Sequence, residues 1–328
     1  MKNIIKKYDV IVVGGGLAGV CTAISAARNG SKTALIQDRP VLGGNSSSEI
    51  KIPLLGAGDF NPGARETGII GEIIDEEKSK NHEMFTECTG NSIKDMVTYE
   101  WVKKEKNLNL YLNTSARDIT IKDKNNISGI KCSQLGTEKE LIFYGKIFID
   151  CTGDGTIGAK AGAIFRYGRE DRKEFKESLA PLKADKKTMG STLMFQSKDL
   201  GKQVTFVPPS WTIKYPSEKS LLKRYHWDIS GGYWWIEIGA DYNTIDDNEK
   251  IKDLLIKHLF GVWDHIKNYC KHKELAKNLT LDWVGAVPGK RESRRLMSDY
   301  ILTENDQKQR VLFDDRVAYA GWFLDVHT

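Results

Sequence analysis

The chain has few cysteines, and those that it has stand far apart. An odd number leaves at least one thiol outside any disulfide scheme, which is typical of proteins in a reducing compartment. No two of the five have the Cys-x-x-Cys spacing of local zinc or iron–sulfur sites: Cys21, Cys88, Cys132, Cys151 and Cys270. The sequence therefore predicts free thiols, no metal and a cytoplasmic location.

Long apolar runs and blocks of one charge are also missing. No stretch approaches the ~20 apolar residues of a membrane span. Residues 1–7 and the apolar run after them resemble a secretory signal, with small residues near Ala26 as a possible cleavage site. Asp9 and a glycine cluster interrupt the pattern. The net charge is only +5 and the basic residues are scattered. Neither a membrane nor a nucleic acid is therefore expected as a partner.

What is present is an ordinary globular composition. Hydrophobic residues make up 40% of the 328 and charged residues 28%, which disfavours extensive disorder. The length is sufficient for two domains, and a chain of this size can bury a core without disulfides or metals.

The first forty residues have a strand–turn–helix–strand pattern. Residues 10–13 are a β-branched run, as in a strand buried on both faces of a parallel sheet. Residues 20–29 are rich in alanine and helical in pattern, and Gly30 suits the end of that helix. Residues 33–36 form a second buried strand.

The turn before that helix has the spacing Gly14-x-Gly16-x-x-Gly19. The first glycine permits a tight turn, the second lets the backbone approach a pyrophosphate, and the third allows close helix–sheet packing. The helix then offers its first N–H groups, around Leu17 and Ala18, to the phosphates. This pattern predicts a dinucleotide site.

The residue that closes the second strand is unusual for such a site. An acid normally stands there and binds the ribose hydroxyls. Here Gln37 occupies the position and Asp38 follows it. Either the Gln37 amide or the Asp38 carboxylate can hydrogen-bond a hydroxyl.

Further elements follow in two groups. Residues 65–80 and 93–104 are expected to be helices. They precede strands of a meander that returns to the main sheet, at residues 108–112, 116–121, 129–133, 140–143 and 146–150.

After Arg166 the pattern changes. Residues 169–187 are dense in charge, which indicates an exposed helix or a linker. A cluster of aromatic and acidic residues follows, Trp234, Trp235 and Glu237. We expect it to be packed in the core, and the alternative is that it lines a substrate pocket. A second, more antiparallel region is predicted from strand signals at 191–196, 203–206 and 233–239 and a long helix over 246–271.

Two later glycine turns favour FAD over NAD. Residues 42–45, Leu-Gly-Gly-Asn, follow the second strand, and residues 147–155 form a strand ending Thr-Gly-Asp-Gly. This order of elements resembles the glutathione-reductase-type FAD-binding fold. The chain resembles the bacterial FAD-dependent oxidoreductase family along nearly its whole length, most specifically at residues 34–49, 150–158 and 289–295. That family is related to the flavin part of heterodisulfide reductase. The cysteine motifs of iron–sulfur clusters are absent here.

The resemblance implies an α/β fold: a Rossmann-like βαβ unit, a parallel sheet with a β-meander, and an inserted α+β substrate domain. It implies an FAD-binding domain over residues 1–165, a substrate or cap domain over 166–284 and a return segment over 285–328. FAD would be the cofactor. Its expected contacts are Gly14, Gly16, Leu17, Ala18, Gly19, Gln37, Asp38, Arg39, Gly43, Gly44, Asn45, Ser46, Ser47, Thr152, Gly153 and Asp154.

Three residues are candidates for catalysis: Arg291, Arg294 and His327. Arginine has a rigid donor fork for anionic groups, and the family places this arginine stretch near the flavin; a salt-bridged surface helix is the alternative. Asp325-x-His327 puts both side chains on one face of a strand, where Asp325 would fix the histidine tautomer. His327 could then move a proton, or it is a structural histidine.

These residues predict an FAD-dependent oxidoreductase that transfers a hydride between flavin and a small molecule, for which anionic and carbohydrate-derived compounds are candidates; the electron acceptor stays open. The alternatives are an NAD(P)-dependent dehydrogenase and a non-catalytic flavin-binding or electron-transfer subunit. FAD folds of this type usually end with a further strand–helix unit, and none follows residue 316. We therefore expect the chain to be truncated and to bind FAD weakly.

Overall fold

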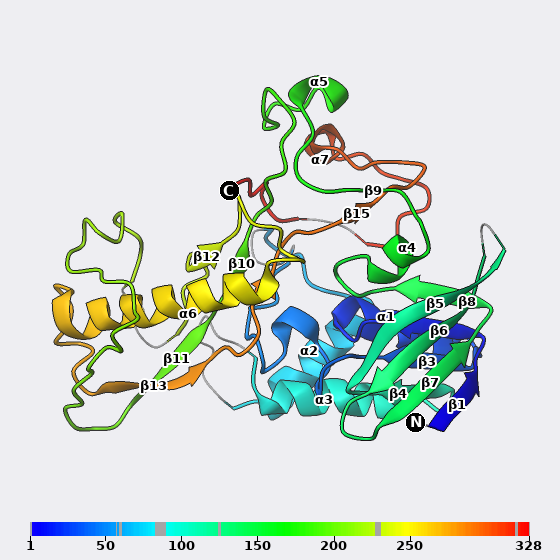
Figure 1. The fold of residues 1–328 in the computed structure, drawn as a ribbon, viewed down its shortest axis with the longest axis horizontal. Helices are drawn as coiled ribbons and strands as arrows, with labels where there is room; N and C mark the ends of the chain where they lie inside the picture. The colour runs from blue at the N-terminus through cyan, green and yellow to red at the C-terminus, as the bar shows by residue number, and fades with distance from the viewer. Residues whose placement is uncertain are drawn as a thin grey trace.

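The computed structural model describes residues 2–56, 58, 61–82, 90–123, 126–226, 231–318 and 321–327. A parallel four-stranded sheet lies at the centre of its first part (Figure 1). Its order is β4 (Leu108–Tyr111), β3 (Thr33–Ile36), β2 (Val10–Val13) and β8 (Ile147–Asp150). Every residue of β2 and β3 is buried, as their β-branched and aliphatic sequences predict.

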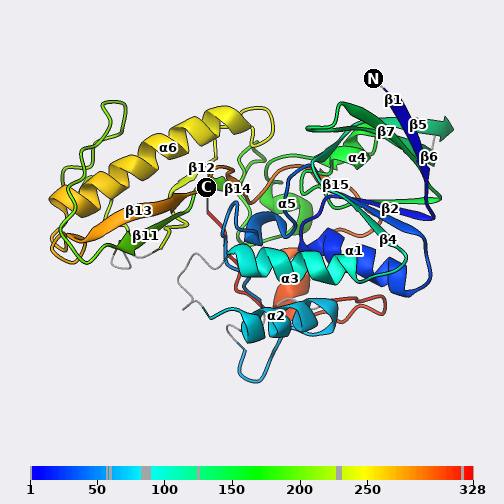
Figure 2. The ribbon, with the colours of Figure 1, turned by 90° about the horizontal axis from the view of Figure 1, so that it is seen from below.

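Helices cover one face of this sheet, as Figure 2 shows. They are α1 (Leu17–Arg28) and α3 (Ser92–Lys103), and α2 (Gly68–Lys80) packs against both of them. Their apolar residues form one buried cluster with the sheet, in which Val12 and Leu35 pack against Val20, Ile24 and Val97. The helices expected over 65–80 and 93–104 are thus confirmed to within a few residues at their ends.

The meander forms a second sheet on the opposite face. Its order is β1 (Lys2–Lys7), β7 (Lys139–Tyr144), β6 (Asn126–Gln134) and β5 (Thr114–Asp123). Ile11 and Ile36 of the parallel sheet pack there against Ile130 and Phe143. The chain then returns to the parallel sheet through β8, as predicted. The strand expected over 108–112 is not part of the meander, because it pairs in parallel with β3 as β4 of the central sheet. The parallel pairing of β1 with β7 was not predicted, since the N-terminal residues resembled a leader.

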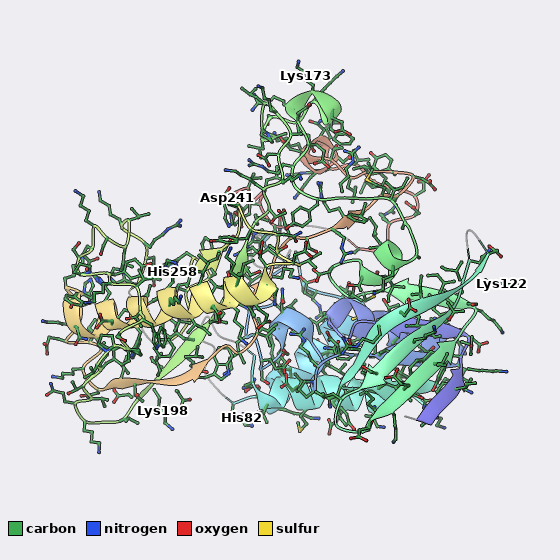
Figure 3. The ribbon with its side chains drawn as sticks, in the orientation of Figure 1. His82, Lys122, Lys173, Lys198, Asp241 and His258 are labelled. Carbon is green, nitrogen blue, oxygen red and sulfur yellow. The ribbon has the colours of Figure 1, made fainter. Side chains whose placement is uncertain are left out.

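The charge-dense stretch is mainly a linker. It contains only the short helix α5 (Arg172–Phe175), because residues 169–187 hold few apolar side chains for packing. Lys173 of this helix is exposed at the outer edge of the molecule (Figure 3). Helix α4 (Thr156–Lys160) precedes the stretch and packs on β5 and β8. Beside the stretch lie the two-stranded pair of β9 (Phe165–Arg166) with β15 (Arg295–Leu296), and α7 (Glu304–Gln309).

A second part is built around the long helix α6 (Asn248–Asp264), which continues as the π-helical turn η3 (His265–Tyr269). Beneath it lie β11 (Phe195–Asp199) and β13 (Leu279–Val284) (Figure 1). Beside it is the sheet of β12 (Glu237–Ile238), β10 (Ser191–Thr192) and β14 (Gly289–Lys290), of which β14 is labelled in Figure 2. The antiparallel pairing and the long helix confirm the expectation for this region.

Two strand predictions in this part need correction. Residues 203–206 are not a strand, although Phe206 packs on the α6 core, and most of 233–239 is irregular apart from β12. In both places apolar side chains pack on the core, but the backbone has no neighbouring strand with which to pair among the described residues.

The described part of the chain has neither a helix that could span a membrane nor a disulfide bond. None of its helices combines the length and the apolar character that a membrane span needs. The thiols of Cys21, Cys132, Cys151 and Cys270 are free, as predicted, while Cys88 lies outside the described residues.

Candidate functional site

A cavity of about 750 Å³ opens at the carboxyl ends of β2, β3 and β8. In open parallel sheets, ligands bind at this edge, where neighbouring connections leave the sheet in opposite directions. The predicted residues that line it are Gly14, Gly16, Leu17, Ala18, Gln37, Asp38, Arg39, Gly43, Gly44, Asn45, Ser46, Thr152, Gly153, Asp154 and Arg291.

Two glycine turns form the floor of this cavity by lying directly against each other. Gly14 has φ +104° and Gly44 has φ +60°, conformations that other residues rarely adopt. A Cβ atom on Gly44 would lie 3.0 Å from the Cα of Gly16. Helix α1 begins here without a side-chain cap, so its first N–H groups and the positive end of its dipole are offered to the cavity.

Gly19 and Ser47 were predicted as contacts, but neither lines the cavity. A Cβ on Gly19 would lie 1.8 Å from the carbonyl oxygen of Gly14, so this glycine lets α1 pack closely under the turn. The hydroxyl of Ser47 donates a 2.7 Å hydrogen bond to the Gly44 carbonyl. Both residues support the loops that line the cavity.

Gln37 is held by the protein itself. Its side chain is buried, with only 2% of the residue exposed. Its Oε1 accepts a 2.7 Å hydrogen bond from the Gly15 N–H, and its Nε2 donates a 3.2 Å bond to the Val41 carbonyl. The amide therefore fastens the two glycine turns together, while the neighbouring Asp38 is exposed at the cavity wall.

The loop after β8 is organised by Asp150. One carboxylate oxygen accepts hydrogen bonds from the Thr152 N–H and hydroxyl, and the other from the N–H groups of Ile157 and Gly158. Residues 152–154 are thereby held along the cavity. Sequence reasoning recognised the glycine turn here but not this carboxylate as its support.

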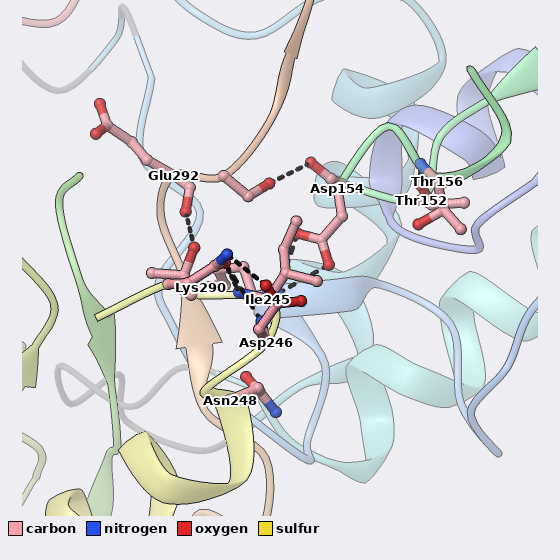
Figure 4. Close-up of polar contacts among 12 residues, drawn as sticks. Thr152, Asp154, Thr156, Ile245, Asp246, Asn248, Lys290 and Glu292 are labelled. Atoms are coloured by element: carbon pink, nitrogen blue, oxygen red, sulfur yellow. Dashed lines mark hydrogen bonds and ion pairs between the residues drawn. The ribbon is translucent and has the colours of Figure 1, made fainter. Parts of the chain in front are cut away.

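Asp154 is paired with a residue that was not predicted. The Lys290 ammonium donates to both oxygens of Asp154, at 3.0 and 2.8 Å (Figure 4). The Asn45 amide donates a 2.9 Å bond to the Lys290 carbonyl. Lys290 also lines the cavity, and its position beside Arg291 in the 289–295 stretch was the available signal.

Arg291 joins the cavity to a cluster of charged groups. Its Nε lies 3.2 Å from Glu237 and its Nη1 3.8 Å from Asp325. His327 contacts the same two carboxylates, with Nδ1 2.9 Å from Asp325 and Nε2 3.2 Å from Glu237. The predicted Asp325–His327 pair is therefore present, although the segment is irregular and has no strand partner among the described residues.

The Trp234 ring packs against this charged cluster. Its ring lies 5.4 Å from the Arg291 guanidinium and 5.9 Å from the His327 ring. Core packing, predicted for both neighbouring tryptophans, holds for Trp235 only. Although partial burial disfavours the charged ring, the hydrogen bonds to Glu237 and Asp325 raise the pKa of His327 above its ordinary value of 6.5.

The other candidate arginine lies elsewhere. The Arg294 guanidinium lies 5.5 Å from the ring of Phe165 and does not line the cavity. His327 lines a smaller space of about 110 Å³. Ser293 lines both spaces, so the histidine stands next to the larger cavity and not within it.

The glycine turns, the helix terminus and the cavity at the switch in strand order define a dinucleotide-binding α/β protein. Residues 9–328 match the family model described as FAD dependent oxidoreductase. The chain belongs to this family, and its cofactor is FAD.

The chain is also similar over a short stretch to two curated transhydrogenases. It is 46% identical over 46 residues to the soluble pyridine nucleotide transhydrogenase of Ectopseudomonas mendocina and 43% over 47 residues to that of Hahella chejuensis, each match covering 14% of this chain. The chain thus spans only 10% of these curated relatives.

Two solved structures resemble most of the chain. The myxobacterial chondrochloren halogenase, an FAD-dependent halogenase, has a TM-score of 0.46 and 15% identity over 90% of this chain and 64% of its own. A geranylgeranyl bacteriochlorophyll reductase-like protein from Thermoplasma acidophilum has a TM-score of 0.43 and 16% identity over 87% of this chain and 66% of its own.

Proposed function

We propose that this oxidoreductase transfers a hydride between a small-molecule substrate and FAD, with Arg291 binding the substrate and His327 carrying the proton. The observation behind this proposal is that Arg291 lines the cavity and also shares Glu237 and Asp325 with His327. A substrate at Arg291 would therefore lie near a histidine whose pKa is raised.

The residues of the cavity fit FAD. The uncapped start of α1 and the adjoining glycine turns suit a pyrophosphate, since they offer N–H groups and leave no Cβ atoms in the way. Asp38 is our candidate for the ribose hydroxyls, because the Gln37 amide is already bonded. Residues 43–46 and 152–154 would hold the rest of the cofactor. When bound, FAD supplies a ring that accepts or returns a hydride.

The chain's own contribution is orientation and charge. The Arg291 guanidinium has five N–H donors, so its contacts with Glu237 and Asp325 leave donors for an anionic group. Asp325 accepts from one His327 nitrogen and orients the ring, while Glu237 contacts the other nitrogen. We infer that the substrate is a carboxylated or carbohydrate-derived alcohol. The neutral form of His327 would accept the hydroxyl proton of this alcohol at Nε2, in place of the contact with Glu237.

Several finer assignments belong to the same proposal. The three-layer arrangement of helices, parallel sheet and meander supports the glutathione-reductase-type subclass. We propose on sequence resemblance alone that the chain is related to the flavin part of heterodisulfide reductase. The division into residues 1–165, 166–284 and 285–328, the cytoplasmic location, and the lack of membrane and nucleic-acid partners are further parts of the proposal.

The test is anaerobic mixing of the FAD-loaded protein with hydroxy acids, amino acids, sugars and NAD(P)H, followed by the loss of flavin absorbance. We expect one of the carboxylated or sugar-derived alcohols to bleach the flavin. Firm FAD binding without bleaching by any donor would instead favour an electron-transfer role. Failure to bind FAD at all, together with tight NAD(P) binding, would favour the nicotinamide alternative.

Two arginine variants test the assigned anchor. Arg291→Met should slow substrate-driven flavin reduction by about 100-fold, because a charged hydrogen bond to the substrate is lost. Arg294→Met is the matched control, since its guanidinium lies against Phe165 outside the cavity, and it should change the rate by about twofold or less. Equal rates for the two variants would remove Arg291 from the substrate site.

A further inference from the structure

Four side chains of the kinds that bind zinc converge in the α6 region, away from the residues that line the FAD cavity. They are Glu218, His226, His265 and Cys270, and one ligand atom from each lies within 4.8 Å of every other. The Nε2 atoms of His226 and His265 lie 3.2 and 3.6 Å from the Glu218 carboxylate. Only 6% of His226, 0% of His265 and 2% of Cys270 is exposed.

Both histidines are oriented for coordination by their other ring nitrogen. Nδ1 of His226 lies 2.8 Å from the Arg224 carbonyl, and Nδ1 of His265 lies 2.6 Å from the Tyr215 carbonyl. A carbonyl only accepts hydrogen bonds, so each Nδ1 carries the hydrogen. In the neutral rings the Nε2 lone pairs then point to the shared centre, which is how metal-binding histidines are usually held.

A bound cation would also suit the charges at this centre when both rings are neutral. A neutral Nε2 presents a lone pair to the oxygens of Glu218, and two lone pairs facing each other repel. The Nε2 of His265 is fully buried and has no hydrogen-bond partner within the described ranges. One divalent cation would satisfy both imidazoles and balance one carboxylate and one thiolate, so that the buried site becomes neutral.

The π-helical turn explains why two of the ligands meet. At η3 the N–H of Cys270 bonds to the carbonyl of His265 at 2.7 Å, five residues back. This wider turn brings both side chains to the same side, whereas a helix with 3.6 residues per turn would separate them. Glu218 and His226 come from the loop that precedes β12.

We propose that Glu218, His226, His265 and Cys270 bind one structural zinc ion. Zinc bonds of about 2.0–2.3 Å in a tetrahedron place ligand atoms roughly 3.3–3.8 Å apart, close to the two nitrogen–oxygen distances observed. Four protein ligands leave no open position, so the ion holds structure and takes no part in catalysis. It fastens the loop of residues 218–226 to the end of α6.

The test begins with the full chain purified without chelator or nickel resin, and measures zinc by mass spectrometry of the metal. We expect about one zinc per chain, and a fall in the melting temperature when the ion is removed. Cobalt added to the metal-free protein should give the visible bands of a tetrahedral site and a near-ultraviolet thiolate band. Cobalt reports on the wild-type site directly, so the test does not depend on a variant that folds.

Variants then assign the ligands. Cys270→Ala should abolish the thiolate band and reduce bound zinc at least tenfold, roughly the loss expected for one ligand. Cys132→Ala is the matched control, because it also removes a fully buried thiol but from the meander sheet. It should keep the zinc.

Two results would overturn the proposal. One is a wild-type protein that takes up neither zinc nor cobalt and melts at the same temperature with and without chelator; this outcome would identify the cluster as a Glu218 ion pair with protonated histidine. The other is a Cys270→Ala protein with full zinc content. FAD content, measured in the same samples, tests the flavin site separately.

Discussion

At the scale of single residues, Gln37 performs two tasks that a carboxylate could not perform together. Its amide accepts a hydrogen bond from the Gly15 N–H and donates one to the Val41 carbonyl. A carboxylate can only accept when ionised. In related sites an acid at this position binds the ribose directly. Here the glutamine instead supports the two glycine turns.

Gln37→Glu should therefore destabilise the protein although it restores the more usual residue type. The change leaves the Val41 carbonyl without this donor and buries a charge, and we expect a loss of about 1–3 kcal/mol in the free energy of unfolding. Denaturant titration of the FAD-free protein measures it. Asp38→Asn, at the exposed cavity wall, is the control and should change stability by less than about 0.5 kcal/mol. Unchanged stability of Gln37→Glu would contradict the assigned role.

His327 makes stability depend on pH. Its pKa is raised above 6.5 in the folded protein by Glu237 and Asp325, against the effect of partial burial. The folded state therefore binds the proton more tightly than the unfolded state. The resulting stabilisation is fully present below pH 6.5 and is lost as the pH rises through the raised pKa.

Comparison of the wild type with His327→Gln across pH 5 to 9 tests this dependence. The stability difference between the two proteins should be largest at the acid end and should shrink as the pH rises. A difference that is constant or grows toward alkaline pH would mean that His327 is not preferentially protonated in the folded state. Unfolding free energies from denaturant titration give the curve directly.

At the scale of elements, the short helix α4 depends on one carboxylate from the preceding strand. Asp150 accepts four hydrogen bonds, two from Thr152 and two from the first turn of α4. Asp171 caps α5 in a similar way but accepts only two bonds, at an exposed site. The two aspartates therefore form a natural comparison.

Asp150→Ala should lower the free energy of unfolding by about 2–3 kcal/mol, since four donors lose their acceptor in a half-buried loop. Asp171→Ala should cost about 1 kcal/mol or less. Thermal or denaturant unfolding of both variants measures the difference. Equal losses would show that the Asp150 contacts add little beyond ordinary helix capping.

The elements differ in how well the sequence predicts them. The β2–α1–β3 unit follows from a β-branched run, a glycine turn and an alanine-rich helix, which are all local signals. Residues 203–206 were predicted as a strand because an apolar residue such as Phe206 in a short run is typical of one. In the structure Phe206 is packed on the α6 core without a strand around it. The π turn at residues 265–269 has no such signal, since its hydrogen-bond pattern depends on tertiary contacts.

At the scale of the whole molecule, the return segment is tied to the sheet by the Lys290–Asp154 ion pair. Lys290→Met would leave Asp154 without its cation at the wall of the cavity proposed for two phosphates. We expect the dissociation constant of FAD to rise about tenfold, or about 1.4 kcal/mol. Flavin fluorescence titration measures it.

A second substitution provides the control. Asp154→Asn added to Lys290→Met removes the uncompensated charge and should restore most of the FAD affinity. If the double variant binds as weakly as the single one, repulsion by Asp154 is not the cause.

The candidate site could be predicted only in part, because some of its residues act locally and others meet only in the folded chain. Gly14, Gly16 and Gly44 act through local backbone geometry, so their spacing identifies them. Glu237 meets Arg291 and His327 only in the folded chain, and no spacing in the sequence indicates that meeting. The four proposed zinc ligands are also brought together only by folding.

The pairing of β1 and β2 with distant strands has a consequence for synthesis. Lys2 pairs with Lys139 in β7, and Val10 pairs with Ile147 in β8. Strand β1 cannot pair with β7 until residues up to Tyr144 have left the ribosome, and β2 cannot pair with β8 until residues up to Asp150 have done so. At roughly 5–20 residues per second, translation of the intervening chain leaves the apolar strand β2 without β8 for about 7–28 s. A nascent chain with this topology therefore carries an unpaired strand edge near its N-terminus early in translation, which is the kind of surface that chaperones bind.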